Sequence, residues 1–156
     1  MGLDMYLEKR NYVQQWEHKG ADNFEVTVSQ HGEPVSHIKP ERIAYVNEEV
    51  GYWRKANHIH NWFVENVQDG KDDCGSYWVN KEDLEKLLSL CKQIIEDPSK
   101  AEELLPTRSG FFFGGTEYDE YYINSIEHTI NILETTLSEV DERGYLHGEI
   151  YYSSSW

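Results

Sequence analysis

The segment at residues 48–68, EEVGYWRKANHIHNWFVENVQ, constrains the fold more than any other part of the chain. When it is projected at about 100° per residue, its apolar side chains share one broad stripe and most of its polar side chains lie opposite. This pattern predicts an amphipathic helix whose aromatic side turns inward. The segment also holds two tryptophans, a His-x-His pair and an Arg-Lys pair. We therefore expect the chain to be organised around this helix, with a binding site on it.

Two later segments predict the other main helices. Residues 81–96 place leucine and isoleucine at helical spacing after Asn80, a residue type that caps helix N-termini. Residues 117–141 show the same spacing after a Gly-Gly-Thr turn at 114–116, with Thr116 as the expected cap. A glycine-rich turn that enters a helix can also hold an anion, so capping and anion binding both stay open for this turn.

Alternation of apolar and polar residues predicts short strands that pair into a sheet. They are expected at residues 2–9, 24–30, 35–38, 76–79 and 145–152. The three phenylalanines at 111–113 predict a buried strand or a loop threaded through the core, and residues 153–156 predict a frayed end. The fold class that follows is α+β. One domain, residues 1–156, is expected to pack a small and mostly antiparallel sheet against three main helices at about 48–68, 81–96 and 117–141.

The charge of the chain is strongly negative and unevenly distributed. The formal net charge is −15, and residues 61–156 hold 13 of these 15 excess negative charges. Such a field repels nucleic acid and anionic membranes, and it accelerates association with a basic partner. We therefore expect no direct contact with nucleic acid and no attachment to a membrane, but a partner protein with a basic surface.

Cysteine usage and hydropathy predict a cytoplasmic protein. Cys74 and Cys91 lack the C-x-x-C spacing and suit a reducing compartment as free thiols. No apolar run in the sequence approaches the length that spans a membrane.

Motifs of known catalytic and metal sites are missing from the sequence. There is no P-loop, nucleophile elbow, H-E-x-x-H or dinucleotide-binding glycine pattern. His58 and His60 would lie about 200° apart on a helix and cannot share one metal, and His60 is expected to be a core histidine. We expect no cofactor and no metal. Hydrolysis with Asp4, His60 or Asp119 as titrating groups is the weakest hypothesis, because the helix dipole keeps a first-turn carboxyl ionised.

Three stretches of the sequence resemble one known group of proteins. They are MGLDMYL at 1–7, YWRKANHIHNWFVENVQDGKDDC at 52–74 and LLPTRSGFFFGGTEYDEYY at 104–122. Together they are similar to a family of small uncharacterised proteins encoded by tailed bacteriophages and prophages, and the similarity spans most of the chain. The resemblance implies an accessory protein that works in the cytoplasm of a bacterial host. The family has no established activity, so no site residue follows from it.

The first functional hypothesis is a non-enzymatic protein that binds and modulates or inhibits a bacterial host protein, such as a defence protein. A basic host surface that normally contacts nucleic acid is the natural target for an acidic chain. The side chains expected to mimic phosphates there are the acids of the third helix, Glu117, Asp119, Glu120, Glu127 and Glu134.

The alternative is a protein that binds or sequesters a small molecule, such as a nucleotide-like signal. Aromatic side chains would supply stacking faces, and charged and amide side chains would supply polar contacts. The candidate ligand-binding residues are Asp4, Tyr6, Trp53, Arg54, Asn57, His58, Asp119 and Tyr122. Arg54 is either a structural ion-pair partner or the anchor for a ligand carboxylate or phosphate, and we expect the anchor.

Overall fold

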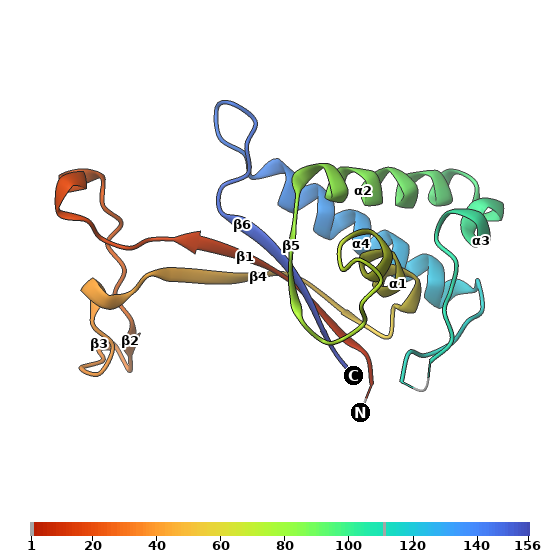
Figure 1. Cartoon of the computed structure of the whole chain (residues 1–156), viewed down its shortest axis with the longest axis horizontal. Helices are drawn as coiled ribbons and strands as arrows, with labels where there is room; N and C mark the ends of the chain where they lie inside the picture. Colours follow the sequence, from red (N-terminus) through yellow and green to blue (C-terminus); the bar gives the residue numbers. More distant parts are fainter. Residues whose placement is uncertain (1, 111) are drawn as a thin grey trace.

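The computed structural model describes residues 2–110 and 112–156, and it shows an α+β fold in which helices cover one face of an antiparallel sheet (Figure 1). The sheet has four strands in the order β4-β1-β6-β5. Their bounds are β1 Asp4–Tyr12, β4 Tyr45–Arg54, β5 Ser76–Val79 and β6 Glu149–Ser155. The expected fold class, α+β with an antiparallel sheet, is confirmed.

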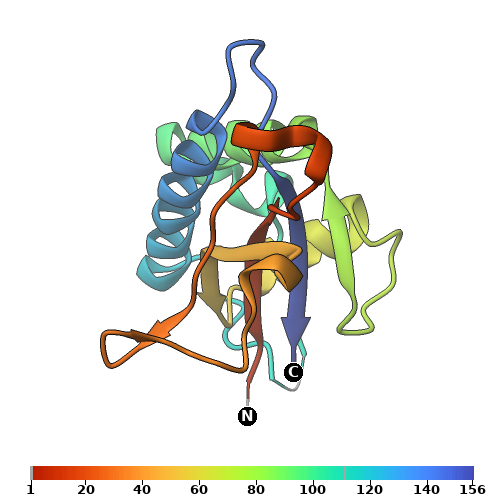
Figure 2. The same ribbon diagram turned by 90° about the vertical axis from the view of Figure 1, so that its left-hand side faces the viewer.

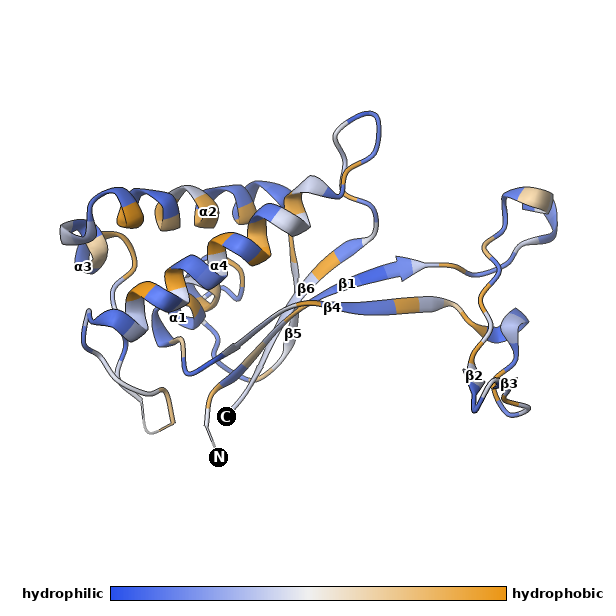
Figure 3. Ribbon diagram, turned by 180° about the vertical axis from the view of Figure 1, so that it is seen from behind, coloured by the Kyte–Doolittle hydropathy of each residue, from blue (hydrophilic) through white to orange (hydrophobic). Residues whose placement is uncertain are grey.

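Helices α2 and α4 pack against each other above the sheet. The helices are α1 Asn57–Asn66, α2 Lys81–Glu96, α3 Ala101–Leu104 and α4 Glu120–Ser138. Figure 3 shows the apolar residues of α2 on the side that faces α4. Helix α2 has the bounds that the sequence predicts, and the Asn80 side chain caps it by accepting from the Asp83 N–H at 2.7 Å. No helix within the described ranges is long and apolar enough to cross a membrane.

The core lies between the inner face of the sheet and the helices. Leu3, Met5 and Leu7 near the start of the chain have no solvent exposure. The Phe63 ring of α1 stacks on the Tyr152 ring of β6, with centroids 3.9 Å apart and planes 7° apart. Aromatic side chains thus join the central helix to the sheet, as the aromatic content of the sequence requires.

The predicted helix at 48–68 is wrong over its first part. Residues up to Arg54 belong to β4, and α1 starts only after a short turn. In the strand Gly51 and Trp53 face the core, whereas Tyr52 and Arg54 face solvent. This is the period-2 pattern of a strand, and pairing along the whole of β1 fixes it. A seven-residue stretch satisfies helical and strand periodicities equally easily, so tertiary pairing decides between them.

Helix α4 is shorter than the predicted 117–141 at both ends. It begins at Glu120, and the residue that caps it is Asp119 rather than Thr116. The Asp119 carboxylate accepts from the Tyr122 N–H at 3.1 Å. The Gly-Gly-Thr turn therefore belongs to the loop before the helix, where the Thr116 carbonyl accepts from Thr107 Oγ1 at 2.9 Å.

The strands also differ from expectation at their ends. Residues 24–28 and 35–38 form no strand, and the short strands found there are β2 Ser29–Gln30 and β3 Glu33–Pro34. The frayed end expected at 153–156 is wrong, because residues 153–155 pair with β1. Of the three phenylalanines at 111–113, Phe111 lies outside the described residues, and Phe113 is buried in a loop.

Strands β1 and β4 extend beyond the helices as a two-stranded arm, which the sequence did not predict (Figures 1 and 2). Strand β6 pairs with β1 only from Asp4 to Arg10, so the outer part of β1 pairs with β4 alone. The end of the arm holds two 3-10 turns, Glu17–Asp22 and Pro40–Arg42, and the β2–β3 pair. Within residues 13–44, all of which are described, Val13 is the one buried side chain. The arm therefore has almost no core of its own.

The substitution Gly51→Ala tests how closely α4 lies on β4. A Cβ at Gly51 would lie 2.7 Å from Ile132 Cγ2, closer than real contacts allow, and 3.3 Å from Leu7 Cβ, which is a tight contact. Because overpacking displaces neighbours, we expect the free energy of unfolding to fall by about 1–3 kcal/mol in chemical denaturation. Gly115→Ala is the control, since a Cβ there meets nothing within 4 Å. Equal stability of the two variants would contradict this packing.

Candidate functional site

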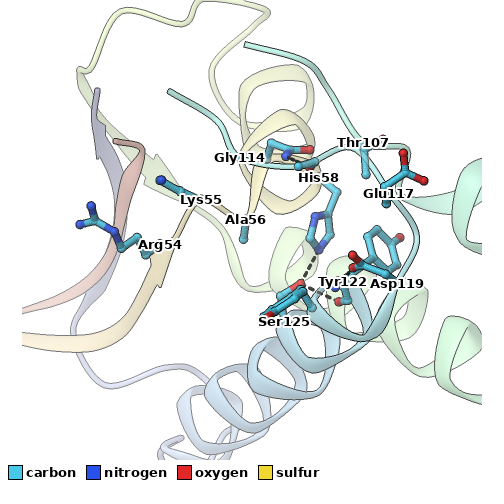
Figure 4. A pocket seen from close by; sticks show the side chains of 13 residues that line it. Arg54, Lys55, Ala56, His58, Thr107, Gly114, Glu117, Asp119, Tyr122 and Ser125 are labelled. Atoms are coloured by element: carbon cyan, nitrogen blue, oxygen red, sulfur yellow. Dashed lines mark hydrogen bonds between the residues drawn. The ribbon is translucent and has the colours of Figure 1, made fainter. Parts of the chain in front are cut away.

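A cavity of about 320 Å³ lies at the corner where β4 ends and α1 begins (Figure 4). The loop at 106–119 and the first turns of α4 form its other walls. Its lining residues are Arg54, Lys55, Ala56, Asn57, His58, Thr107, Gly114, Gly115, Glu117, Asp119, Tyr121, Tyr122 and Ser125. The cavity brings together five of the predicted ligand-binding residues, Arg54, Asn57, His58, Asp119 and Tyr122.

Asn57 holds the cavity loop against the start of α1. Its side chain is buried, and its Nδ2 donates to the carbonyl oxygens of Phe113 at 3.0 Å and Gly115 at 2.8 Å. Its Oδ1 accepts from the Arg108 N–H at 2.9 Å. Both Nδ2 donors and the Oδ1 acceptor are used, as burial of an amide demands. Asn57 therefore shapes the cavity wall and leaves no donor for a ligand.

The turn between β4 and α1 brings Lys55 against the cavity loop. Lys55 adopts a φ of 56°, and Gly114 faces it with a φ of 86°. A Cβ at Gly114 would lie 2.9 Å from Lys55 Cβ, so glycine permits this approach. The Lys55 ammonium makes no ion pair with any residue that the structure describes. In Figure 4, Arg54 and Lys55 point to one side, away from His58 and Ser125.

His58 and Ser125 meet inside the cavity, where Nε2 and Oγ are 2.6 Å apart (Figure 4). Ser125 Oγ also donates to the Tyr122 carbonyl oxygen at 2.7 Å. Because its proton is used there, His58 Nε2 is the donor toward Ser125. The His58 ring lies 4.2 Å from the Tyr122 ring, whose hydroxyl donates to the Leu105 carbonyl at 2.8 Å. These contacts join α1, α4 and the preceding loop.

The hydrogen-bond directions at His58 and Ser125 argue against nucleophilic catalysis at this pair. Burial lowers the pKa of His58 to about 3, so the imidazole is neutral at pH 7. A serine nucleophile needs its hydroxyl proton directed at the base. Here the proton of Ser125 points to a main-chain carbonyl instead. The arrangement is suited to rigid shape and to binding rather than to hydrolysis.

Three predicted ligand-binding residues lie away from the cavity. Asp4 and Tyr6 lie on the sheet face that the helices leave open, where Asp4 accepts from Tyr52 Oη at 2.5 Å and pairs with Arg54 at 3.2 Å. The Tyr6 and Tyr52 rings are 5.5 Å apart. Trp53 faces the core, and its Nε1 donates to Thr129 Oγ1 at 2.8 Å. Because side chains alternate along a strand, these predicted ligand-binding residues are divided between the open face and the core face of the sheet.

His60 is a buried histidine of the core, with both ring nitrogens bonded. Nδ1 lies 2.6 Å from Tyr152 Oη, and Nε2 lies 2.9 Å from Asp72 Oδ1. Trp156 Nε1 donates to the same carboxylate oxygen at 3.0 Å. Burial lowers the pKa of His60, and the charge of Asp72 opposes that effect. The hydrolysis hypothesis named Asp4, His60 or Asp119 as titrating groups, and these three residues occupy the open sheet face, the core and the α4 cap.

The predicted partner-binding carboxylates extend from the cavity along α4. All five, Glu117, Asp119, Glu120, Glu127 and Glu134, are solvent-exposed. Three of them recur every seven residues, which places them on one stripe about 10.5 Å apart along the helix axis. Glu134 forms an exposed ion pair with Lys92 at 3.1 Å. Glu117, Glu120 and Glu127 make no ion pair with a described residue.

Sequence reasoning missed several cavity residues. Lys55 was noted only as part of an Arg-Lys pair, and its backbone conformation depends on a glycine 59 positions away. Ser125 and Thr107 carry no pattern that marks them as functional. Tyr121, which is the most exposed large aromatic of α4, lies beside the predicted Tyr122 and was the residue most open to detection.

Comparisons with known proteins give no match: no protein family, no curated protein and no solved structure is similar to this chain. Within the described residues, no group of three or more histidine, cysteine or carboxylate side chains could hold a metal ion. The functional assignment therefore depends on the geometry of the cavity and of the acidic stripe.

The buried His58 predicts a specific loss of stability in acid. Its pKa is near 6.5 when unfolded and about 3 when folded, so the unfolded chain binds the extra proton. Stability is therefore complete above pH 6.5 and falls as the pH drops below it. Between pH 6.5 and 5, His58 should contribute a loss of about 1–2 kcal/mol. Denaturation of His58→Gln should show a shallower pH slope, whereas a variant at the exposed His18, His18→Gln, should keep the original slope. Equal slopes in all three proteins would contradict the buried neutral imidazole.

Proposed function

We propose that the protein acts without catalysis, by binding a basic surface of another protein through the carboxylates of α4. The observation that carries the proposal is the exposed stripe of Glu120, Glu127 and Glu134 on α4, together with the exposed Glu117 and Asp119, which line the cavity just before the helix. Carboxylates presented along a rigid helix attract a row of lysine or arginine side chains, and the net charge of −15 steers such a partner toward the protein.

The cavity at the N-terminal end of α4 gives the partner a place to insert a basic side chain. Glu117 and Asp119 line it together with Tyr121 and Tyr122. A cation that enters gains both carboxylates and aromatic faces, the two kinds of group that bind ammonium and guanidinium best. The contact would then be anchored at one end and aligned by the stripe.

The resemblance to phage and prophage proteins suggests where the partner is found. An accessory protein of that kind would work in the cytoplasm of a bacterial host, and the proposed role of this one is to modulate or inhibit a host protein such as a defence protein. Host proteins that contact nucleic acid carry the basic surface that this stripe fits. The acidic helix would then occupy the surface where phosphates normally bind.

The triple variant Glu120→Gln, Glu127→Gln, Glu134→Gln tests the stripe. It removes the negative charge while keeping side-chain size and helix propensity. We expect the partner recovered by pull-down from bacterial lysate at low salt to bind about tenfold or more weakly to the variant, with the wild-type interaction itself weakened at high salt. Biolayer interferometry with the purified partner gives the affinities.

A matched control removes the same number of negative charges from α2. The variant Glu82→Gln, Glu85→Gln, Glu96→Gln alters exposed positions of a different helix, and it should bind almost as wild type. If both triple variants lose affinity equally, net charge and not the α4 stripe is responsible. Recovery of no specific partner at either salt concentration would also count against the proposal.

A second candidate function is the binding of a small anionic molecule in the cavity, such as a nucleotide-like signal. The observation in its favour is the Lys55 ammonium, which belongs to the side of the cavity away from His58 and Ser125 and has no ion pair with a described residue in a chain holding 29 acids. A ligand phosphate or carboxylate would satisfy it. Native mass spectrometry of the purified protein is the direct test, since a retained ligand adds mass.

Variants at Arg54 and Lys55 distinguish the two candidates. Arg54→Ala should lower the free energy of unfolding by less than about 1 kcal/mol, because its pair with Asp4 is exposed. If the cavity binds an anion, Arg54→Lys and Lys55→Met abolish the thermal shift caused by that ligand, whereas the remote Lys100→Met retains it. A nucleotide panel that shifts no melting temperature would exclude this candidate. Loss of stability in Arg54→Ala would instead place Arg54 in a structural network.

A further inference from the structure

The outer edge of β4 is open along the arm. Strand β4 is the last strand of the sheet and pairs with β1 alone. Close to the helices the edge is occupied at one point, where His128 Nε2 donates to the Tyr52 carbonyl oxygen at 2.8 Å. Toward Tyr45 the strand continues into the arm and away from α4 (Figure 1). A second strand can therefore approach this edge only on the arm side of Tyr52.

The backbone groups on that edge can be assigned from the ladder. The Val13 N–H donates to the Ala44 carbonyl at 2.9 Å, which makes this a hydrogen-bonded pair. Opposed pairs in an antiparallel ladder alternate between bonded and non-bonded, so Tyr45, Asn47 and Glu49 direct their N–H and C=O groups outward. Within the described ranges these groups have no hydrogen-bond partner. An edge of this kind is a template for another strand.

We propose that a second copy of this chain docks on this edge, with the two β4 strands paired antiparallel about a two-fold axis at Asn47. An antiparallel pair of identical strands is self-complementary, so one surface serves both copies. This register places Glu49 opposite Tyr45 of the second copy and Glu48 opposite its Val46. No two carboxylates face each other directly, and Glu48 is already paired with Lys9 at 3.6 Å.

Charge favours the arm as the place where a second copy can make contact. Residues 9–49, which include the proposed contact, hold seven acidic and five basic side chains, so this part of the chain carries two of the 15 excess negative charges. The other 13 belong to the rest of the chain, where two copies would repel each other at close range. Because the arm extends away from the helices, arm-to-arm contact keeps the acidic bodies apart (Figure 1).

Exposed aromatic side chains beside the edge supply the apolar part of the interface. Tyr12, Trp16 and Tyr45 are 44%, 47% and 54% exposed. The Tyr12 and Tyr45 rings lie 5.3 Å apart, and Trp16 Nε1 donates to Tyr12 Oη at 2.9 Å. The cluster is thus ordered before binding, which lowers the entropy cost of association. Tyrosine and tryptophan are the residues most often found at the centre of interfaces.

A disulfide across the two-fold axis tests the register. We replace the exposed Cys74 by serine and introduce Asn47→Cys. In the proposed dimer the two Cα atoms at 47 lie about 5.5 Å apart, within the range that a disulfide spans. Under mild oxidation we expect a covalent dimer on non-reducing gels, formed at least about tenfold faster than in the control Ser29→Cys, which lies elsewhere in the arm. Equal rates at 47 and 29 would overturn the proposal.

Sedimentation of the unmodified chain tests the assembly without cysteine chemistry. We expect a concentration-dependent shift from monomer to dimer mass, and a monomer at all concentrations for Asn47→Pro. Proline removes the outward N–H but leaves the β1 ladder intact, as edge strands tolerate. Circular dichroism confirms that this variant is folded. A wild-type chain that stays monomeric, or a dimer that survives Asn47→Pro, would overturn the proposal.

Discussion

The pairing of β1 along both of its edges is the constraint on which the rest of the structure depends. One edge of β1 pairs with β4 and the other with β6, so Asp4 lies opposite both Arg54 and Ser155. Alternate residues, Met5 and Leu7, point inward and are fully buried beneath the helices. Sheet order and core are therefore set by one strand, whose partners are distant in sequence. The arm is the continuation of the same strand beyond the reach of β6.

The parts of the fold that could be predicted from sequence are those whose signals are local. Helix α2 combines a cap at Asn80 with an uninterrupted apolar stripe, and its bounds match. The first part of 48–68 carries no local signal that distinguishes a strand from a helix, because its apolar residues fit both. Pairing with β1 makes it a strand. Residues 153–155 are all serine, which carries no strand signal, and they are ordered by pairing alone. The arm could not be predicted from the sequence, because it too is ordered by strand pairing.

The candidate site, like the fold, could be predicted from the sequence only in part. Asn57, His58 and Tyr122 were chosen because they are polar or aromatic residues near a predicted helix, and folding does bring them to one cavity. Trp53 is turned to the core because the segment is a strand. The bonds that hold the cavity loop run from Asn57 to the main-chain carbonyls of Phe113 and Gly115, and side-chain patterns carry no information on main-chain groups. The acids of α4 were predictable, since exposure follows from helix periodicity.

Strand β4 joins the arm to the cavity. It runs from the outer arm at Tyr45 to the cavity at Arg54, a length of about 30 Å. A β-bulge is a point where an extra residue bends a strand and increases its twist. The register shift opposite Leu7 and Glu8 is such a point, and it lies between the arm and the covered part of the sheet. The bulge therefore sets the direction in which the arm leaves the sheet, and with it the orientation of the open β4 edge relative to the cavity.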